Sequence, residues 1–323
     1  VGDIVLGKKV GNKALLWGAV AGTIPDLDVF VGKMVDPITA NLWHRGFSHS
    51  LLFSLLCAPL LGWLIHRVYK RKWGSWKDWT MLSFWSLVTH PLLDAHTAWG
   101  TQFFWPLDLR LAFKNIFVID PLYTLPFLVC TILAMRISKD DPKRTLWSKR
   151  GLMVSTAYLA LSFTLKAWVY LRFESALERQ QYTFIDLETR PSPMNTILWS
   201  CIVEQEEHYL IGHHSLLADP EGIRFYSVPK NHHLLEPYLE ETLVQDLIYM
   251  AQGHYVMQEK EGQLIFNDLR FGQSGFDNPE AEFIYSYNLS WNGEQLSAVE
   301  RPKSFEEGGE ILKELWLRIK GKG

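Results

Sequence analysis

The sequence predicts a polytopic α-helical membrane bundle of about five hydrophobic helices, followed by a soluble α+β domain. Two observations support this fold class. Apolar segments that approach the length of a membrane helix are confined to the first half of the 323-residue chain. Charge divides in the same way, because residues 1–172 carry 20 Lys/Arg against 10 Asp/Glu, whereas residues 173–323 carry 12 against 25. Such asymmetry indicates a membrane domain over residues 1–172 and an acidic α+β domain over residues 173–323.

Five segments of the first half are rich in apolar residues. The fourth and fifth reach the roughly 20 residues that span a bilayer, the second is short, and polar residues interrupt the third. The first segment stops at Pro25, since proline ends or kinks a helix. The chain begins at Val1 and not at a methionine, so a further helix upstream of the first segment is an open alternative. The five segments are Ala14–Val35, Leu51–Arg67, Trp79–Trp99, Ile116–Met135 and Gly151–Tyr170.

Basic residues gather in alternate connections between these segments. Loops that are rich in Lys and Arg stay on the cytoplasmic side of a membrane. The remaining connections, over residues 33–50 and 94–115, are then expected on the outer side, and the C-terminal domain with them. The basic residues are Lys8, Lys9 and Lys13; Arg67, Lys70, Arg71, Lys72 and Lys77; and Arg136, Lys139, Lys143, Arg144, Lys149 and Arg150.

The second half alternates apolar and polar residues with a period of two, which predicts strands. After the fifth segment, residues 172–179 are expected to continue as a helix. The expected strands cover residues 182–187, 197–203, 222–228, 255–257 and 283–287, and the expected helices lie near residues 238–252 and 305–319.

Three short clusters of acids and histidines lie at the outer ends of hydrophobic segments. Ionisable residues are costly inside a membrane, so these clusters are candidates for a functional site. One holds His90 and Asp94, whose i, i+4 spacing places both side chains on one helix face. The clusters are Pro25-Asp26-Leu27-Asp28, His44-Arg45-Gly46-Phe47-Ser48-His49-Ser50 and His90-Pro91-Leu92-Leu93-Asp94-Ala95-His96-Thr97.

Each cluster alone also has a structural interpretation. His90 and Asp94 could form a buried hydrogen bond that only fixes two helices. The two aspartates after Pro25 could be a turn pair, since Asp favours caps and turns. The histidines of the second cluster could contact headgroups, and Ser48 is expected to cap the helix that follows.

Taken together, the clusters favour a metal site with nitrogen and oxygen ligands. The three cysteines are too dispersed for a thiolate site. Six ligands exceed the need of one ion and suit two zinc-like ions, with manganese as the alternative. Two such ions activate water for phosphoester or ester hydrolysis. The expected ligands are Asp26, Asp28, His44, His49, His90 and Asp94.

Further candidates lie on the same expected face. Arg45 or Arg110 could grip a phosphate through two hydrogen bonds, or either could extend to the membrane surface instead. Asp120 is a further ligand or a residue that orients a histidine. The histidine pairs His213-His214 and His232-His233 are interpreted as solvated loops.

These motifs resemble the YdjM-like family of inner-membrane metal-dependent hydrolases. The resemblance covers roughly residues 14–130 and implies a bacterial inner-membrane location and a metal-dependent hydrolase. The His-x-x-x-Asp element is more distantly similar to the zinc-dependent phospholipase C and single-strand nuclease group. The matching residues are Pro25-Asp26-Leu27-Asp28, His44-Arg45-Gly46-Phe47-Ser48-His49-Ser50, His90-x-x-x-Asp94-x-x-Thr97-x-x-Gly100 with Phe104-Trp105-Pro106, and Asp120-Pro121-Leu122-Tyr123-Thr124.

The sequence as a whole predicts a multi-pass inner-membrane hydrolase. Its active site would lie at the outer, periplasmic or extracellular face and cleave a phosphoester or ester bond of a lipid or lipid-linked substrate. Two other functions stay open: an ion or metal transporter, and a sensor or assembly factor with a structural metal. Nucleic-acid binding is not expected, because membrane topology explains the basic stretches. The sequence does not indicate an oligomeric state.

Overall fold

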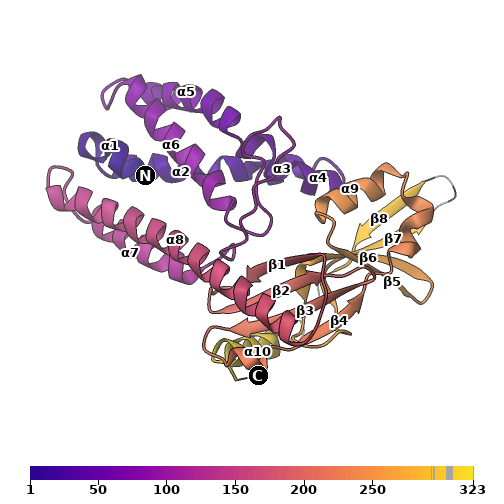
Figure 1. The fold of residues 1–323 in the computed structure, drawn as a ribbon. Helices are drawn as coiled ribbons and strands as arrows, with labels where there is room; N and C mark the ends of the chain where they lie inside the picture. The colour runs from indigo at the N-terminus through magenta and orange to yellow at the C-terminus, as the bar shows by residue number, and fades with distance from the viewer. Residues whose placement is uncertain (292, 294, 303–307, 323) are drawn as a thin grey trace. The chain divides into compact units, whose positions relative to one another are not determined.

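The computed structural model describes residues 1–322 except 292, 294 and 303–307. The chain divides into two compact units (Figure 1). The first comprises residues 1–163 with 193–195, and the second comprises residues 164–192 with 196–323. Helix α8 (Pro142–Arg179) contributes residues to both.

The named secondary-structure elements of the first unit are all helices. Every one of the five hydrophobic segments contains a helix, as predicted, and a short helix precedes the first of them. Pro25 separates the first segment into α2 and α3, as expected of a residue that cannot continue a helix. In chain order the elements are α1 (Gly2–Val10), α2 (Asn12–Thr23), η1 (Pro25–Leu27), α3 (Asp28–Gly32), α4 (Pro37–Trp43), η2 (Phe47–His49), α5 (Leu51–Val68), α6 (Trp76–Asp94), α7 (Pro121–Met135) and the first part of α8.

Within the described residues, two helices, α5 and α8, are long and apolar enough to cross a membrane. A third candidate combines α2 with η1 and α3, which are bent by 42° at the break between them. Helix α7 is apolar but has only 15 residues. Two to three spans are therefore supported, and the expected number of about five is not confirmed.

Aromatic and basic residues mark the two ends of the apolar stretch of α8. The Arg150 guanidinium lies 5.0 Å from the Trp147 ring centroid, and that of Arg172 lies 4.7 Å from the Trp168 ring centroid. About 21 residues separate the two tryptophans, which corresponds to about 31 Å along a helix. This matches the roughly 30 Å hydrocarbon core of a bilayer, where tryptophans favour both boundaries.

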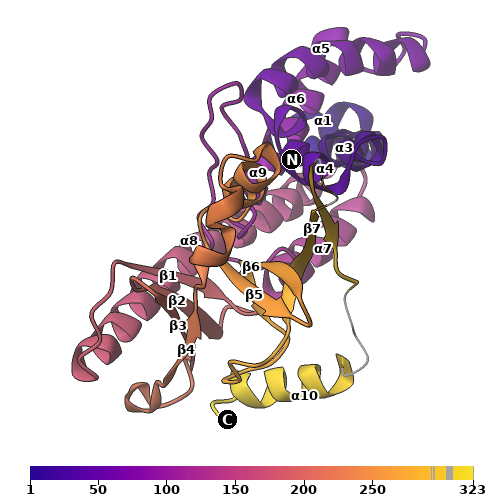
Figure 2. The same ribbon diagram turned by 90° about the vertical axis from the view of Figure 1, so that its right-hand side faces the viewer.

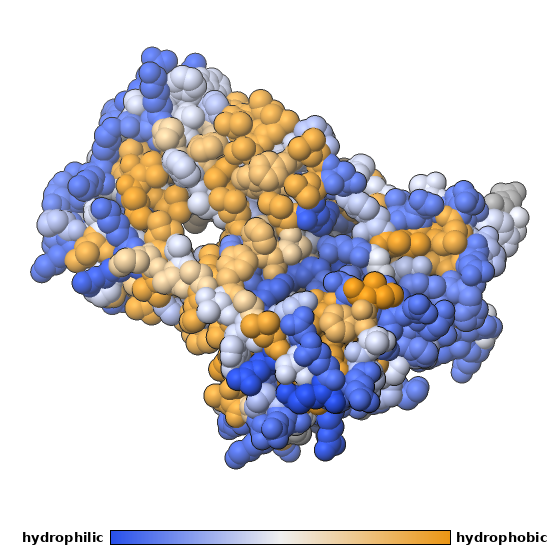
Figure 3. Space-filling view, in the orientation of Figure 1, coloured by the Kyte–Doolittle hydropathy of each residue, from blue (hydrophilic) through white to orange (hydrophobic). Residues whose placement is uncertain are grey.

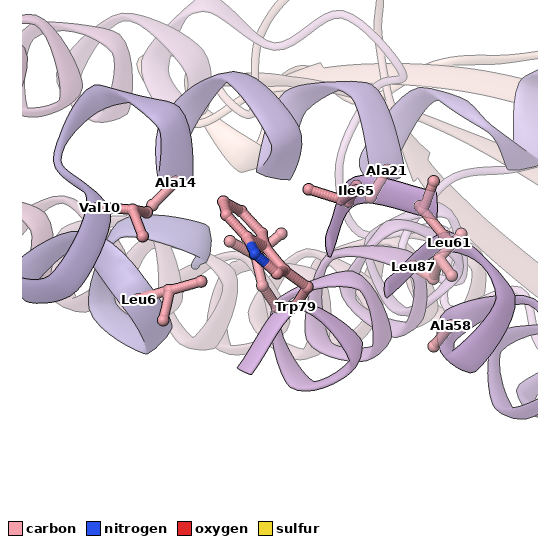
Figure 4. Packing of buried hydrophobic residues seen from close by; sticks show 10 residues of the cluster. Leu6, Val10, Ala14, Ala21, Ala58, Leu61, Ile65, Trp79 and Leu87 are labelled. Carbon is pink, nitrogen blue, oxygen red and sulfur yellow. The ribbon is translucent and has the colours of Figure 1, made fainter. Parts of the chain in front are cut away.

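The core of the first unit is built around Trp79 of α6, which is fully buried between α1, α2 and α5 (Figure 4). Its indole Nε1 donates a hydrogen bond to the Trp73 carbonyl at 2.7 Å. Helices α5 and α6 approach closely at Gly62, where a Cβ would lie 2.4 Å from the Thr80 hydroxyl. Small residues at such contacts are typical of membrane helix pairs.

The surface of the first unit is largely apolar. Figure 3 shows hydrophobic residues gathered over its helices, with hydrophilic residues at the end where the α5–α6 and α7–α8 connections lie. Those connections contain the basic residues Arg71, Lys72 and Lys139. The pattern fits helices that contact lipid along their length and water at their ends.

The second unit contains two four-stranded antiparallel sheets, each with its strands in sequence order (Figure 2). Two helices, α9 (Thr242–Met250) and α10 (Gly308–Ile319), accompany them. The first sheet comprises β1 (Asp186–Pro191), β2 (Leu198–Glu204), β3 (His208–Ser215) and β4 (Phe225–Pro229), and the second comprises β5 (Tyr255–Lys260), β6 (Gln263–Gln273), β7 (Phe283–Trp291) and β8 (Leu296–Glu300).

Both faces of β2 are buried, which explains its almost continuous apolar sequence. Trp199 and Cys201 pack on one face against Phe173 of α8. Ile202 points to the other face and packs with Val256 of β5. Because successive side chains of a strand alternate between faces, β2 contacts α8 on one face and the second sheet on the other.

Most of the elements predicted for this unit are confirmed. Four expected strands correspond to β2, β4, β5 and β7, and the helices correspond to α9 and α10, although residues 303–307 lie outside the described residues. The strand expected over residues 182–187 is wrong, because β1 begins only at Asp186. The loop interpretation of His213-His214 is also wrong, since both lie in β3 and His214 is buried.

Candidate metal centre

Three separate segments of the first unit bring four ionisable side chains together. Asp26 comes from η1, which Pro25 opens after the end of α2. His49 ends η2, directly before Ser50 caps α5. His90 and Asp94 lie one turn apart at the end of α6. One donor atom from each residue lies within 4.8 Å of the other three.

Four distances between nitrogen and oxygen atoms of this cluster are the same. The Nε2 atom of His49 lies 3.3 Å from Asp26 Oδ1 and 3.3 Å from Asp94 Oδ2. The Nε2 atom of His90 lies 3.3 Å from the same two oxygens. Zinc–ligand bonds of about 2.0–2.1 Å in a tetrahedron place neighbouring ligand atoms about 3.3 Å apart. Four of the six separations among the donor atoms therefore match a tetrahedral ion, and all six are below 4.8 Å.

Hydrogen bonding within the protein leaves two of these atoms unsatisfied. His90 Nε2 and Asp94 Oδ2 are buried and have no hydrogen-bond partner among the described residues. Buried polar atoms without partners are rare in folded proteins, and an ion is one recognised reason for them. The side chains present thus fit a divalent metal.

The cluster is open on one side. The His49 side chain is fully buried, whereas that of Asp26 is 50% exposed. His90 is half-buried and Asp94 is buried, with side chains 21% and 12% exposed. A molecule that reaches this centre would approach from the side of Asp26.

Asp28 organises the segment around His49. Its Oδ2 accepts hydrogen bonds from the Ser48 hydroxyl at 2.8 Å and from the Arg45 amide at 3.2 Å. The same oxygen lies 3.4 Å from His49 Nδ1, and Oδ1 lies 3.0 Å from His44 Nδ1. A carboxylate on the far nitrogen of an imidazole fixes the ring so that Nε2 can face a metal.

The surroundings of His49 favour a cation. Burial by itself lowers the pKa of this imidazole, but the neighbouring carboxylates of Asp26, Asp28 and Asp94 outweigh it and raise the pKa to about 10. A buried ring between three carboxylates is thus electrostatically matched to a positive charge, which a proton or a metal ion supplies.

Arg45 is held against the opposite oxygen of Asp94. Its Nη2 lies 3.3 Å from Asp94 Oδ1, and its Nη1 donates a 2.8 Å hydrogen bond to the Thr97 hydroxyl. The Thr97 hydroxyl in turn donates to the Asp94 carbonyl at 2.7 Å. Arg45 has a φ of 58°, an uncommon conformation for a non-glycine residue. Its amide binds Asp28, and its carbonyl accepts from the amide of Gln102.

The other predicted site residues have different surroundings. Asp120 caps α7 by accepting from the amides of Leu122 and Tyr123, and it accepts from the Tyr158 hydroxyl at 2.8 Å. Arg110 lies half-buried in the connection between α6 and α7. Neither belongs to the four-residue cluster.

Sequence reasoning misassigned one residue of the second motif. Ser50, not Ser48, caps α5 by accepting from the Phe53 amide. Ser48 instead contacts Asp28 and His49 Nδ1. The signal available was its position next to His49, which favours a contact with that ring as readily as a cap.

Two comparisons with known proteins bear on this site. Residues 1–169 match the model of the YdjM inner membrane protein family. The inner membrane protein YbcI of Escherichia coli (strain K12) is 38% identical over 101 residues, which is 31% of this chain and 57% of that protein. No solved structure matches the chain.

Family and relative agree with the membrane character of the helices and support an inner-membrane location. The matched region contains the complete four-residue cluster. Since the family model covers more than half of the residues, the chain belongs to the YdjM inner membrane protein family.

Proposed function

We propose that this protein is a membrane-bound, metal-dependent hydrolase that cleaves a phosphoester or ester bond of a lipid or lipid-linked substrate at the outer face of the inner membrane. The observation that carries the proposal is the convergence of Asp26, His49, His90 and Asp94 with separations suited to one tetrahedral ion. A zinc-like ion fits the two imidazoles and two carboxylates best, with manganese as the alternative.

The chemistry follows from the open side of the cluster. A divalent ion bound there would polarise a phosphoryl or carbonyl oxygen and acidify a neighbouring water. Asp26 is the exposed carboxylate of the set and is placed to accept a proton from that water. Arg45 would keep Asp94 in place, and Arg110 would hold the anionic group of the substrate.

The number of ions is part of the proposal. The four converging atoms define one position, and Asp28 and His44 form a pair beside it with donor atoms 3.0 Å apart. In our proposal this pair orients His49 when one ion is bound. The two-ion centre predicted from the sequence would require the pair to release its hydrogen bonds and bind the second ion.

The position of the cluster along the helices supports a substrate in the membrane. Helix α6 begins at Trp76, next to the basic connection that contains Arg71 and Lys72. His90 and Asp94 lie about 21–27 Å further along the helix axis. This distance corresponds to the opposite headgroup region of a bilayer, where a lipid can diffuse laterally to the site.

One observation favours a second function. Four protein ligands complete a tetrahedral set, and closed sets of this kind are typical of structural metals. In that case the ion would join η1, η2 and α6 in a sensor or assembly factor without hydrolysing anything. The 50% exposure of the Asp26 side chain supports the hydrolase, because a hydrolase needs a metal that water or substrate can reach.

The first experiment is metal analysis of detergent-purified protein, with wild type beside His90→Ala/Asp94→Ala. We expect about one zinc per chain in the wild type and none in the double variant. His96→Ala is the matched control, since His96 lies just after the end of α6 but its Nδ1 pairs with Asn115 Oδ1 at 3.0 Å. Well-folded wild type that neither holds nor takes up metal would overturn the proposal.

Activity is then tested with phospholipid vesicles that contain reconstituted protein. A hydrolase should lose turnover when a chelator removes the ion and regain it when zinc returns. Bound zinc without turnover on any phosphoester or ester lipid, combined with a lower melting temperature after chelation, would support the structural alternative instead.

A further inference from the structure

We propose that the α3–α4 hairpin inserts its apolar face into the interfacial region of the bilayer that surrounds the metal centre. The hairpin comprises residues 28–43, and its two helices pack together where Gly32 meets Ala40. Figures 1 and 2 both show α3 and α4 side by side, and Figure 1 shows them beyond the end of α2. Its insertion does not depend on whether the centre hydrolyses a substrate.

Large apolar side chains of the hairpin are exposed. Met34, at the tip between the two helices, is 85% exposed, and Phe30 of α3 is 58% exposed. Val29, Val31 and Trp43 are also exposed. Five large exposed apolar residues on one short hairpin are unusual for a surface that faces only water.

Three polar side chains of the hairpin have partners within the protein. Asp28 is engaged with His44 and Ser48 inside the site. Asp36 accepts hydrogen bonds from the amides of Ile38 and Thr39 at the start of α4. Lys33 lies over the Phe30 ring at 5.2 Å, as a lysine does when its stem crosses apolar surface and its ammonium group reaches headgroups.

Continuity with the membrane segments identifies lipid as the occupant. Helix α2 together with η1 and α3 is long and apolar enough to span a membrane, although the chain bends by 42° at the break. An apolar helix that bends near the headgroup level and continues as a short hairpin is typical of an interfacial segment. A lipid surface therefore covers this face better than a soluble partner does.

The hairpin is also connected to the site at both ends. It begins at Asp28 and is followed directly by His44, and these side chains contact each other at 3.0 Å. Lipid that holds the hairpin thus holds the residues that orient His49. The same contact places acyl chains beside the exposed side of Asp26.

Fluorescence quenching in proteoliposomes tests the insertion. Met34→Cys is labelled in detergent with an environment-sensitive fluorophore, in full-length protein that carries Cys57→Ala; Cys130 and Cys201 are buried. The protein is then reconstituted, and quenching by spin-labelled phosphatidylcholine is compared with quenching by aqueous iodide. Leu217→Cys is the control, because Leu217 is 66% exposed in the second unit.

We expect spin-labelled lipid to quench the label at residue 34 at least several-fold more than the label at residue 217, with the reverse order for iodide. Equal access of iodide to both labels would overturn the proposal. A label at residue 34 that neither quencher reaches would overturn it as well, and would indicate a second copy or another protein on the hairpin. Zinc content of the labelled variant, measured separately, reports on the metal centre independently.

Discussion

Charge balance around His49 explains the arrangement of the side chains at this centre. Asp26, Asp28 and Asp94 approach one buried imidazole, and Arg45 neutralises part of this negative charge from outside. Removing a buried group from such a set leaves its partners uncompensated, which costs more than the contact itself contributes. Each residue can therefore be assigned a role by what its removal does to metal affinity.

The variant Asp28→Asn tests whether Asp28 orients His49 or binds the metal itself. We expect the variant to keep its metal stoichiometry but to bind zinc about 10–100-fold more weakly, as is typical when a carboxylate behind a histidine is lost. Competition with a chromophoric chelator measures the affinity. Asp36→Asn is the matched control, because Asp36 only caps α4. Complete loss of metal, as in His90→Ala/Asp94→Ala, would instead make Asp28 a ligand and favour two ions.

Zinc affinity and KM together distinguish the role of Arg45 from that of Arg110. Since Arg45 contacts Asp94 at 3.3 Å, Arg45→Gln should weaken zinc binding about tenfold. Arg110→Gln should leave zinc binding unchanged and raise KM for an anionic lipid. If Arg45→Gln raised KM alone while metal affinity stayed the same, Arg45 would be the residue that grips the substrate.

At the scale of elements, the site depends on close helix packing. Helices α5 and α6 meet at Gly62 and Thr80, and the same two helices adjoin His49 and carry His90 toward the cluster. Their separation sets the distance across the centre. A larger residue at the contact would push apart the groups that share an ion.

Gly62→Ala tests this dependence. The added Cβ would lie 2.4–2.8 Å from Thr80 atoms, two of them backbone atoms, so the helices must separate. We expect destabilisation of about 1–3 kcal/mol, typical of overpacking, together with weaker zinc binding. Thermal unfolding in detergent and chelator competition measure the two effects. Gly22→Ala is the control, because its Cβ would only meet the Ser86 carbonyl at 3.9 Å; equal behaviour of both variants would contradict the packing argument.

An element can be predicted from sequence when residues close together in the chain determine it, and not when distant residues do. The shared face of His90 and Asp94 was predictable, since helical periodicity is local. Strand β6 was missed because its buried positions include Asp268 and Arg270, which pair with each other at 2.6 Å and break the apolar alternation. The two residues are close in sequence, but their burial depends on the packing around β6 and is visible only once the chain is folded.

The same reasoning applies to the site. Sequence motifs identified all four residues of the cluster, but not the network around Asp28. That network depends on the positive φ of Arg45 and on the hydrogen bond from Gln102, a residue 57 positions after Arg45 in sequence. Long-range backbone contacts of this kind have no local signature.

At the scale of the whole chain, the side of the membrane on which the C-terminal unit lies depends on which helices cross the bilayer. Helix α8 begins after the basic α7–α8 connection and continues into the second unit. The α5–α6 and α7–α8 connections are both basic and are expected on one side of the membrane, so α6 and α7 would either both cross or both stay on that side. In either case α8 starts on the side where α5 ends, and three or five spans lead to the same side for the C-terminal unit.

This topology predicts that the second unit lies outside the cytoplasm. Loops rich in Lys and Arg stay inside, so Lys139→Cys should be protected and Leu217→Cys accessible. An impermeant maleimide applied to intact spheroplasts, with Cys57→Ala as the background, should label residue 217 at once and residue 139 only after permeabilisation. The opposite pattern would move the second unit to the cytoplasm and the metal centre with it. A substrate from the outer leaflet would then be excluded, even if zinc binding and the geometry of the four ligands were unchanged.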